Sequence, residues 1–122
     1  LCLLGDFSKA MDEHRLALSI RETALGKNHP MTAESHTNIG IVLCQKGDYE
    51  VAEWRHRKAL RIREAMRGKD DEDCAVSLSH LGDVLSRKGD YDTAIKELKR
   101  ATKIREHNLG MDNPVTAGSY LD

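Results

Sequence analysis

Residues 47–52 read Gly-Asp-Tyr-Glu-Val-Ala, and closely related hexapeptides stand at equal distances on either side, at 5–10 and 89–94. The flanking sequence follows the same period, because a shift by this distance superposes small, apolar and turn residues without a slip. The matching sets are Ala17, Ala59 and Ala101; the Ile-Arg-Glu triplets at 20–22, 62–64 and 104–106; and Gly26, Gly68 and Gly110. The chain is therefore built from an internal repeat.

Each period predicts a helical hairpin. Apolar residues run at helical spacing on both sides of the Gly-Asp pair, where glycine favours a helix C-terminus and aspartate the next N-cap. The predicted first-type helices span about 31–46 and 73–88, and the second-type helices about 7–25, 49–67 and 91–109. Residues 1–4 and 114–122 would belong to two incomplete helices. We expect a single array over 1–122, with a partial repeat at 1–4 and units at about 5–46, 47–88 and 89–122, the last truncated.

The composition favours an all-α fold and gives no global charge signal. Aromatic residues make up only 4% of the chain, and the formal net charge of −1 points to neither nucleic acid nor an anionic membrane. No cationic leader or long apolar stretch predicts a signal peptide or a membrane span. Cys2, Cys44 and Cys74 lie far apart without a C-x-x-C motif, so we expect neither a disulfide framework nor a zinc module, and a reducing, cytoplasmic location.

Small residues recur where helices would cross closely. Ala10, Ala52 and Ala94 are one period apart, and so are Gly40 and Gly82. Because a larger side chain would not fit at a close crossing, we expect these positions to mark helix contacts. One hairpin cannot bury its apolar faces alone, so neighbouring hairpins are expected to stack.

The pattern G-D-Y-x-x-A followed by A-L-x-I-x-E, with an earlier L-G, resembles the tetratricopeptide repeat over essentially the whole chain. The 42-residue period and the connection G-K-N-H-P at 26–30 are more specifically similar to the kinesin light chain type. The connection at 68–73 departs from that type because it lacks the His-Pro pair. The resemblance implies a right-handed superhelical solenoid of antiparallel helical hairpins, whose first-type helices line a concave groove. It also implies a module that binds a peptide or helix of a partner protein, within a larger scaffold or signalling protein.

The resemblance places twelve residues on the groove face of the two first-type helices. They are Glu34, Thr37, Asn38, Ile41, Cys44, Gln45, Val76, Ser79, His80, Asp83, Ser86 and Arg87. Spacings of three, four and seven independently put each set on one side of a helix, while His36, Ile39, Gly40 and Leu43 form a separate packing face. Asn38 matches the asparagine with which this family often holds a ligand backbone, since an amide offers a donor and an acceptor. His80 replaces it one period later.

One familiar ligand type is not expected. Related domains that clamp a carboxylate use lysines and arginines on the groove, whereas the corresponding places here hold Thr37, Ser79, Ile41 and Asp83. Arg87 has two readings: it contacts a ligand, or it pairs with Asp83 one turn away.

The sequence predicts no catalytic, metal or cofactor site. None of the six histidines forms an H-x-x-x-H pair with further ligands, and His14 and His56 are better explained as equivalent packing positions. The Gly26-Lys27-Asn28 segment lacks the other residues of a phosphate-binding loop. Nothing in the pattern indicates an activated thiolate at Cys44, and no nucleophile, base and oxyanion donors converge. We therefore expect no enzyme.

A basic run on one second-type helix is an alternative site for phosphates. It comprises Arg55, His56, Arg57, Lys58, Arg61, Arg63, Arg67 and Lys69. Its charges spread around the helix and an acidic block at 70–73 follows at once, so a solvated face with internal pairing is favoured over nucleic-acid binding. Trp54 is either a wedge between repeats or an exposed anchor for a partner.

A second function remains open beside peptide binding. The chain would then be a structural spacer or a self-associating segment without its own ligand. Apolar residues near its two ends would stack end to end with other copies; they are Leu1, Leu3, Leu4, Val115 and Leu121.

Overall fold

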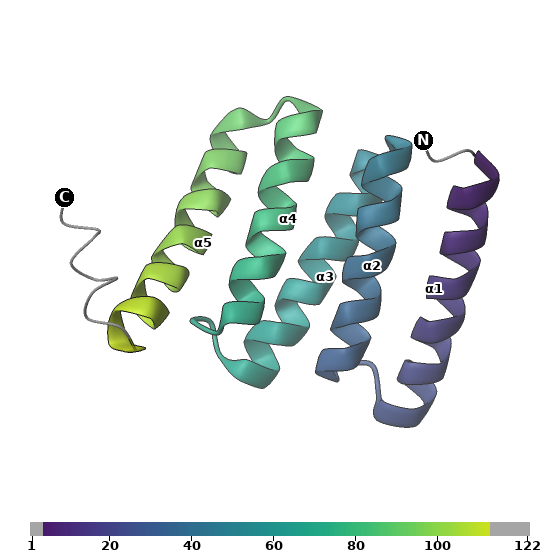
Figure 1. The fold of residues 1–122 in the computed structure, drawn as a ribbon, viewed down its shortest axis with the longest axis horizontal. Helices are drawn as coiled ribbons and strands as arrows, with labels where there is room; N and C mark the ends of the chain where they lie inside the picture. Colours follow the sequence, from purple (N-terminus) through teal and green to yellow (C-terminus); the bar gives the residue numbers. More distant parts are fainter. Residues whose placement is uncertain (1–3, 113–122) are drawn as a thin grey trace.

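The computed structural model describes residues 4–112 of the chain, with side chains described for 6–110. This part contains five helices and no strand, and each helix runs antiparallel to the one before it (Figure 1). The helices are α1 (Leu4–Leu25), α2 (Pro30–Lys46), α3 (Tyr49–Arg67), α4 (Glu72–Lys88) and α5 (Tyr91–Asp112). Each packs on its neighbours in the chain, and α2 also touches α4. The predicted all-α solenoid of helical hairpins is confirmed.

The observed helices match the predicted ones closely except at the two ends of the array. Helix α1 begins at Leu4 and runs through the Gly5-Asp6 pair, and α5 runs through Gly110 to Asp112. The expected breaks at both glycines, and the assignment of Leu4 to a preceding helix, are therefore wrong. Glycine permits a turn without imposing one, because it is also tolerated inside a helix at a cost of roughly 1 kcal/mol. The remaining residues of the two predicted incomplete helices lie outside the described part of the chain.

The Gly-Asp pairs at 47–48 and 89–90 close the tight turns. Gly47 adopts a left-handed conformation with φ of 89°, which glycine accommodates because it has no Cβ. The N–H of Asp48 then donates to the carbonyl of Leu43 at 2.8 Å, which ends α2. Asp48 takes the N-cap position of α3 as predicted, but its carboxylate makes no capping hydrogen bond. The expected side-chain cap of α3 is therefore absent, while the backbone carbonyl of Asp48 accepts from the N–H of Ala52 at 3.1 Å.

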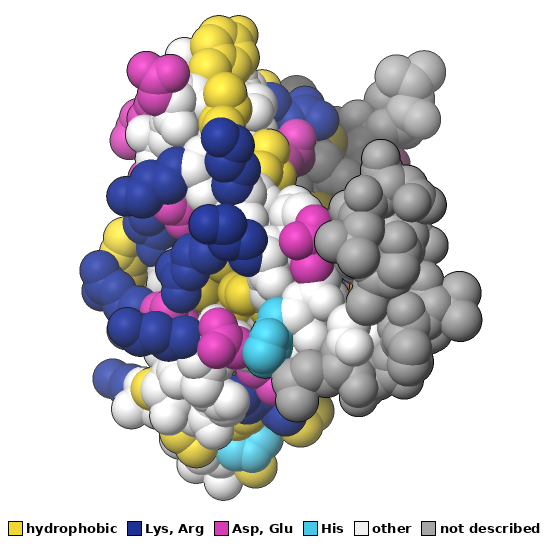
Figure 2. All heavy atoms as spheres, turned by 90° about the vertical axis from the view of Figure 1, so that its left-hand side faces the viewer, with side chains coloured by type: hydrophobic (Ala, Val, Ile, Leu, Met, Phe, Trp, Pro, Cys, Tyr) yellow, Lys and Arg dark blue, Asp and Glu magenta, His cyan; other side chains and the backbone are white. Residues whose placement is uncertain are grey.

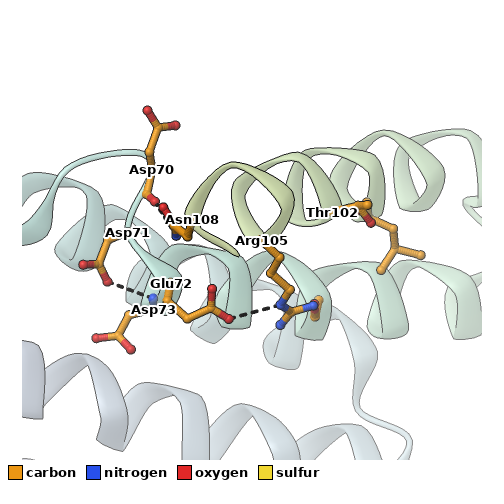
Figure 3. A network of polar contacts seen from close by, with 9 residues as sticks. Asp70, Asp71, Glu72, Asp73, Thr102, Arg105 and Asn108 are labelled. Atoms are coloured by element: carbon orange, nitrogen blue, oxygen red, sulfur yellow. Dashed lines mark hydrogen bonds and ion pairs between the residues drawn. The ribbon is translucent and has the colours of Figure 1, made fainter. Parts of the chain in front are cut away.

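The connection between α3 and α4 closes in the same way as the one between α1 and α2, although it lacks the His-Pro pair. His29 Nδ1 accepts from the N–H of Met31 at 3.1 Å, and one period later the carboxylate of Asp71 accepts from the N–H of Asp73 at 2.8 Å. Figure 3 shows Glu72, the first residue of α4, pointing to Arg105 of α5, whose Nε donates to its carboxylate at 3.2 Å. The acidic block at 70–73 is thus used to cap and fasten α4.

Side chains one period apart also repeat two further hydrogen bonds. Thr32 Oγ1 donates to the carbonyl of Gly26 at 2.7 Å, and Cys74 Sγ donates to the carbonyl of Gly68 at 3.2 Å. Arg21 of α1 donates to Ser35 of α2 at 3.0 Å, and the buried Arg63 of α3 donates to Ser77 of α4 at 2.7 Å. The second set, which we call the Arg–Ser clasps, joins each second-type helix to the next first-type helix.

Gly40 and Gly82 lie at close helix crossings, as predicted. A Cβ added to Gly40 would lie 2.7 Å from Cε1 and Nε2 of His56 on α3, and one added to Gly82 would lie 2.5 Å from Leu98 on α5. His56 is only 1% exposed and its ring is held by stacking on His80, whereas Leu98 is 39% exposed and can move aside.

The first prediction follows from this difference. Gly40→Ala is expected to cost about 1–3 kcal/mol by overpacking, offset in part by roughly 1 kcal/mol of helix propensity. Gly82→Ala gains the same propensity and is expected to be nearly neutral. Urea unfolding followed by circular dichroism measures both. Equal losses in the two variants would show that burial of the opposing side chain does not set the cost.

Candidate functional site

A pocket of about 210 Å³ opens between α2 and α4. On each of the two helices the lining residues are spaced by three or four, so they share one side of the helix. These two sides face each other across the pocket. Its lining is Ile41, Cys44 and Gln45 from α2, His56 from α3, and His80, Asp83, Val84 and Arg87 from α4. Six of the twelve predicted groove residues are therefore brought together in one concave place: Ile41, Cys44, Gln45, His80, Asp83 and Arg87.

The other six predicted residues lie outside the pocket. Glu34 is exposed and pairs with Arg21 at 3.7 Å, and the Ser79 hydroxyl accepts from Arg105 of α5 at 3.0 Å. Thr37 is buried and its hydroxyl has no hydrogen-bond partner among the described residues, so it does not present a free surface. Asn38, Val76 and Ser86 are half-buried.

Two lining residues were not predicted for the groove, His56 and Val84. His56 comes from a second-type helix and reaches the pocket because Gly40 leaves space for its ring. It stacks on His80, with the ring centroids 5.0 Å apart and the planes 9° from parallel. The pairing of Gly40 with a large residue one helix later is the sequence signal that would have found it.

Burial keeps the two stacked imidazoles neutral. The pKa of His56 falls from 6.5 to about 4, first because burial disfavours the charged ring and then because His80 and Arg63 are close. Burial likewise lowers the pKa of His80. Nδ1 of His56 is buried without a hydrogen-bond partner in the described part of the molecule. The pocket thus offers neutral rings that can donate or accept a hydrogen bond.

Polar groups at the mouth of the pocket pair with one another. Arg87 Nε lies 3.1 Å from Asp83 Oδ1, so the internal pairing, one of the two readings of Arg87, is present. Cys44 Sγ lies 4.0 Å from Asp83 Oδ2. Burial, and then the Asp83 charge, raise the pKa of the Cys44 thiol, so it stays protonated and is a poor nucleophile. The arrangement suits recognition through hydrogen bonds and contacts.

The basic run on α3 is partly engaged within the protein. Arg57 pairs with Glu53 at 2.8 Å, Arg67 pairs with Asp73 at 3.2 Å, and the buried Arg63 forms a clasp with Ser77. Within the described part of the chain, the acidic block at 70–73 therefore pairs directly with one cation of this run, Arg67.

The structure also settles the position of Trp54. The indole is 54% exposed, so it is a surface residue and does not wedge between helices. The guanidinium of Arg55 lies 5.0 Å from its ring centroid, and His36 meets it edge-on.

Two further searches concern the described residues. Among residues 4–112, no three histidine, cysteine, aspartate or glutamate side chains are grouped so that they could hold a metal ion. None of the described helices combines the length and the apolar character needed to cross a membrane.

Comparisons with known proteins agree with the fold. A family model described as tetratricopeptide repeat matches residues 1–65 and 37–107. A comparison with curated proteins found no significant match. Among solved structures, the crystal structure of BtubC (BKLC) from P. vanneervenii is similar, with 27% sequence identity and a TM-score of 0.78. The similarity covers 90% of this chain and 43% of that chain, so the chain spans less than half of its neighbour.

The predicted likeness to repeats of the kinesin light chain type is confirmed by these matches. The family model alone covers well over half of the chain. Together with the row of antiparallel helices, these matches show that the chain belongs to the tetratricopeptide repeat family, whose repeats generally mediate interactions between proteins.

Proposed function

We propose that the chain is a non-catalytic module that holds a segment of a partner protein along α2 and α4, with one side chain of that segment in the pocket between them. The observation that carries this proposal is the pocket itself, because six residues predicted for a ligand groove converge on it from two helices. We place the module in a larger cytoplasmic scaffold or signalling protein. The free thiols of Cys44 and Cys74 support a reducing setting.

The lining indicates how a segment would be held. Ile41 and Val84 offer apolar contact, while Gln45 and the neutral His80 supply hydrogen-bond donors and acceptors. Asn38, half-buried and about two turns before Gln45 on α2, extends the polar surface. A pocket that combines apolar walls with a few polar groups is typical of sites that bind one side chain and its adjoining backbone.

The test begins with peptides selected from a random library on the immobilised wild-type chain. The variant Asn38→Ala/Gln45→Ala/His80→Ala is expected to bind a selected peptide at least about tenfold more weakly, a loss of about 1.4 kcal/mol. Ser19→Ala/Thr23→Ala/Asn28→Ala, which removes three exposed polar side chains elsewhere, is the matched control. Circular dichroism and melting check that both variants fold. Unchanged affinity in the groove variant, or an equal loss in the control, would refute the proposal.

A further inference from the structure

The carboxylate of Asp83, which lines the pocket between α2 and α4, uses mainly one of its two oxygens within the protein. Oδ1 accepts from Nε of Arg87 at 3.1 Å. Oδ2 is directed toward α2, where its hydrogen-bonding partner among the described residues is the Cys44 thiol, at 4.0 Å. A thiol is a weak donor, so Oδ2 can accept a stronger hydrogen bond from a group that enters the pocket.

The ring of His80 lies on the same side of α4 as Asp83, three residues earlier. It is half-buried, whereas His56, on which it stacks, is only 1% exposed, so His80 is the ring that a ligand meets. Burial lowers the pKa of both rings, so neither carries a charge at neutral pH. A guanidinium stacks well on a flat ring, and a neutral imidazole does not repel it.

The charges of the lining disfavour an anionic side chain. Among the described lining residues, Arg87 is the only permanent cation, and its Nε is bound to Asp83. A carboxylate that approached Arg87 would also approach Asp83, where the like charges repel. A cation, by contrast, can use Oδ2 of Asp83 and leave the existing ion pair intact.

The other cations of the molecule do not make the pocket a site for anions. Arg63 and Arg105 contribute to the low pKa of His80, but neither lines the pocket. Arg63 donates to Ser77 at 2.7 Å, and Arg105 pairs with Glu72 at 3.2 Å. Figure 2 shows further Lys and Arg side chains gathered on the α5 side, with Asp and Glu side chains among them, and no described residue of α5 lines the pocket.

We propose that the side chain held by this pocket is an arginine of the partner segment. Its guanidinium donates a charge-assisted hydrogen bond to Oδ2 of Asp83 and stacks on His80, and its aliphatic part contacts Ile41 and Val84. A lysine can reach the same oxygen, but its ammonium group has no plane that stacks on the ring. The inference rests on the proposed function, because it names the side chain for which the same pocket is selective.

The test uses peptides that were selected on the wild-type chain and that lose affinity for the Asn38→Ala/Gln45→Ala/His80→Ala variant. We expect these peptides to share an arginine at one position. Replacing this arginine with citrulline, its neutral isostere, is expected to weaken binding at least about tenfold, as measured by the fluorescence anisotropy of the labelled peptide. Lysine at the same position is expected to bind more weakly than arginine, and glutamate more weakly than citrulline.

A variant of the protein tests the role of the carboxylate. Asp83→Asn keeps the shape of the side chain and removes its charge, so the arginine and citrulline peptides are expected to bind this variant about equally. Asp12→Asn removes the same charge from an exposed residue of α1 and is expected to keep the wild-type preference for arginine. Circular dichroism and melting curves check that both variants fold.

The outcomes separate this inference from the proposed function. If no selected peptide depends on the groove residues, both fail. If groove-dependent peptides share no arginine, if lysine binds as tightly as arginine, or if Asp83→Asn keeps the preference for arginine over citrulline, this inference alone is overturned. An equal loss of preference in the two aspartate variants would show that only net charge matters, and it would overturn the inference as well.

Discussion

Lowering the pH from about 7 to about 5 is expected to reduce the free energy of unfolding by about 2 kcal/mol for each of two buried histidines, His36 and His56. Both have a folded-state pKa of about 4, against 6.5 for an ordinary histidine. Together they represent a large share of the roughly 5–15 kcal/mol that stabilises a typical domain. Urea unfolding at a series of pH values measures the loss.

The direction follows from where each ring carries a proton. Burial is the main cause of both low pKa values, and nearby cations add to it: Arg55 and Lys58 for His36, and Arg63 for His56, which also faces His80 and Asp83. The unfolded chain takes up protons below about pH 6.5 while the folded chain does not until about pH 4, so protonation favours unfolding in that window. The hydrogen-bonded Glu53, whose pKa lies below the usual 4.5, loses its stabilising effect only at lower pH.

The chain supplies its own control for this prediction. One period after His36 and His56 stand Leu78 and Leu98. The double variant His36→Leu/His56→Leu therefore places leucine where the next hairpin already has it. Its stability is expected to fall clearly less than that of wild type between about pH 7 and about pH 5, with a remaining dependence from His80, whose pKa burial also lowers. A pH dependence as steep as that of wild type would assign the effect to other groups.

Leu78→Ala is expected to destabilise the chain by about 2–5 kcal/mol. The Leu78 side chain of α4 is 0% exposed. It belongs to a cluster with Leu60 of α3, Leu81 of α4 and Ile104 of α5. Removing its branched end loses the favourable free energy of transferring those apolar atoms out of water, and it leaves a cavity that the neighbouring helices fill only partly. Thermal and urea unfolding measure the loss.

Leu16→Ala is the matched control for this change. Leu16 is 63% exposed, so the same truncation is expected to alter stability by less than about 0.5 kcal/mol. A small effect at Leu78 would mean that the helices close around the missing atoms.

The fold could be predicted well because a repeat provides the same information more than once. Three copies of the Gly-Asp hexapeptide and of the Ile-Arg-Glu triplet place turns and helices in one register, so an ambiguous position in one period is resolved by its counterpart. The ends were harder to predict. A glycine ends a helix only where the chain folds back. Gly5 and Gly110 occupy positions equivalent to turn glycines such as Gly47, but they lie within helices.

The candidate site was predicted less completely because helical spacing identifies one side of a helix but not how deep each side chain lies. Thr37 shares a side with Ile41, yet it is buried. His56 was assigned to packing from its place on a second-type helix, and only the space left by Gly40 shows that its ring also reaches the pocket.

The Arg–Ser clasps have a mechanical consequence. Each clasp joins a second-type helix to the first-type helix that follows it, and we call this interface a joint. The array can bend only if its joints deform. The joint between α3 and α4 holds a buried guanidinium at 2.7 Å from its hydroxyl, and Lys88 adds ties to Glu50 and Glu53 there, so it resists bending strongly. The joint between α1 and α2 has a longer and more exposed clasp, in which Arg21 also donates to the carbonyl of Met31 at 2.9 Å and lies 3.7 Å from Glu34. We therefore expect flexing to be concentrated on the α1 side, so that the width of the pocket between α2 and α4 changes little when the array bends.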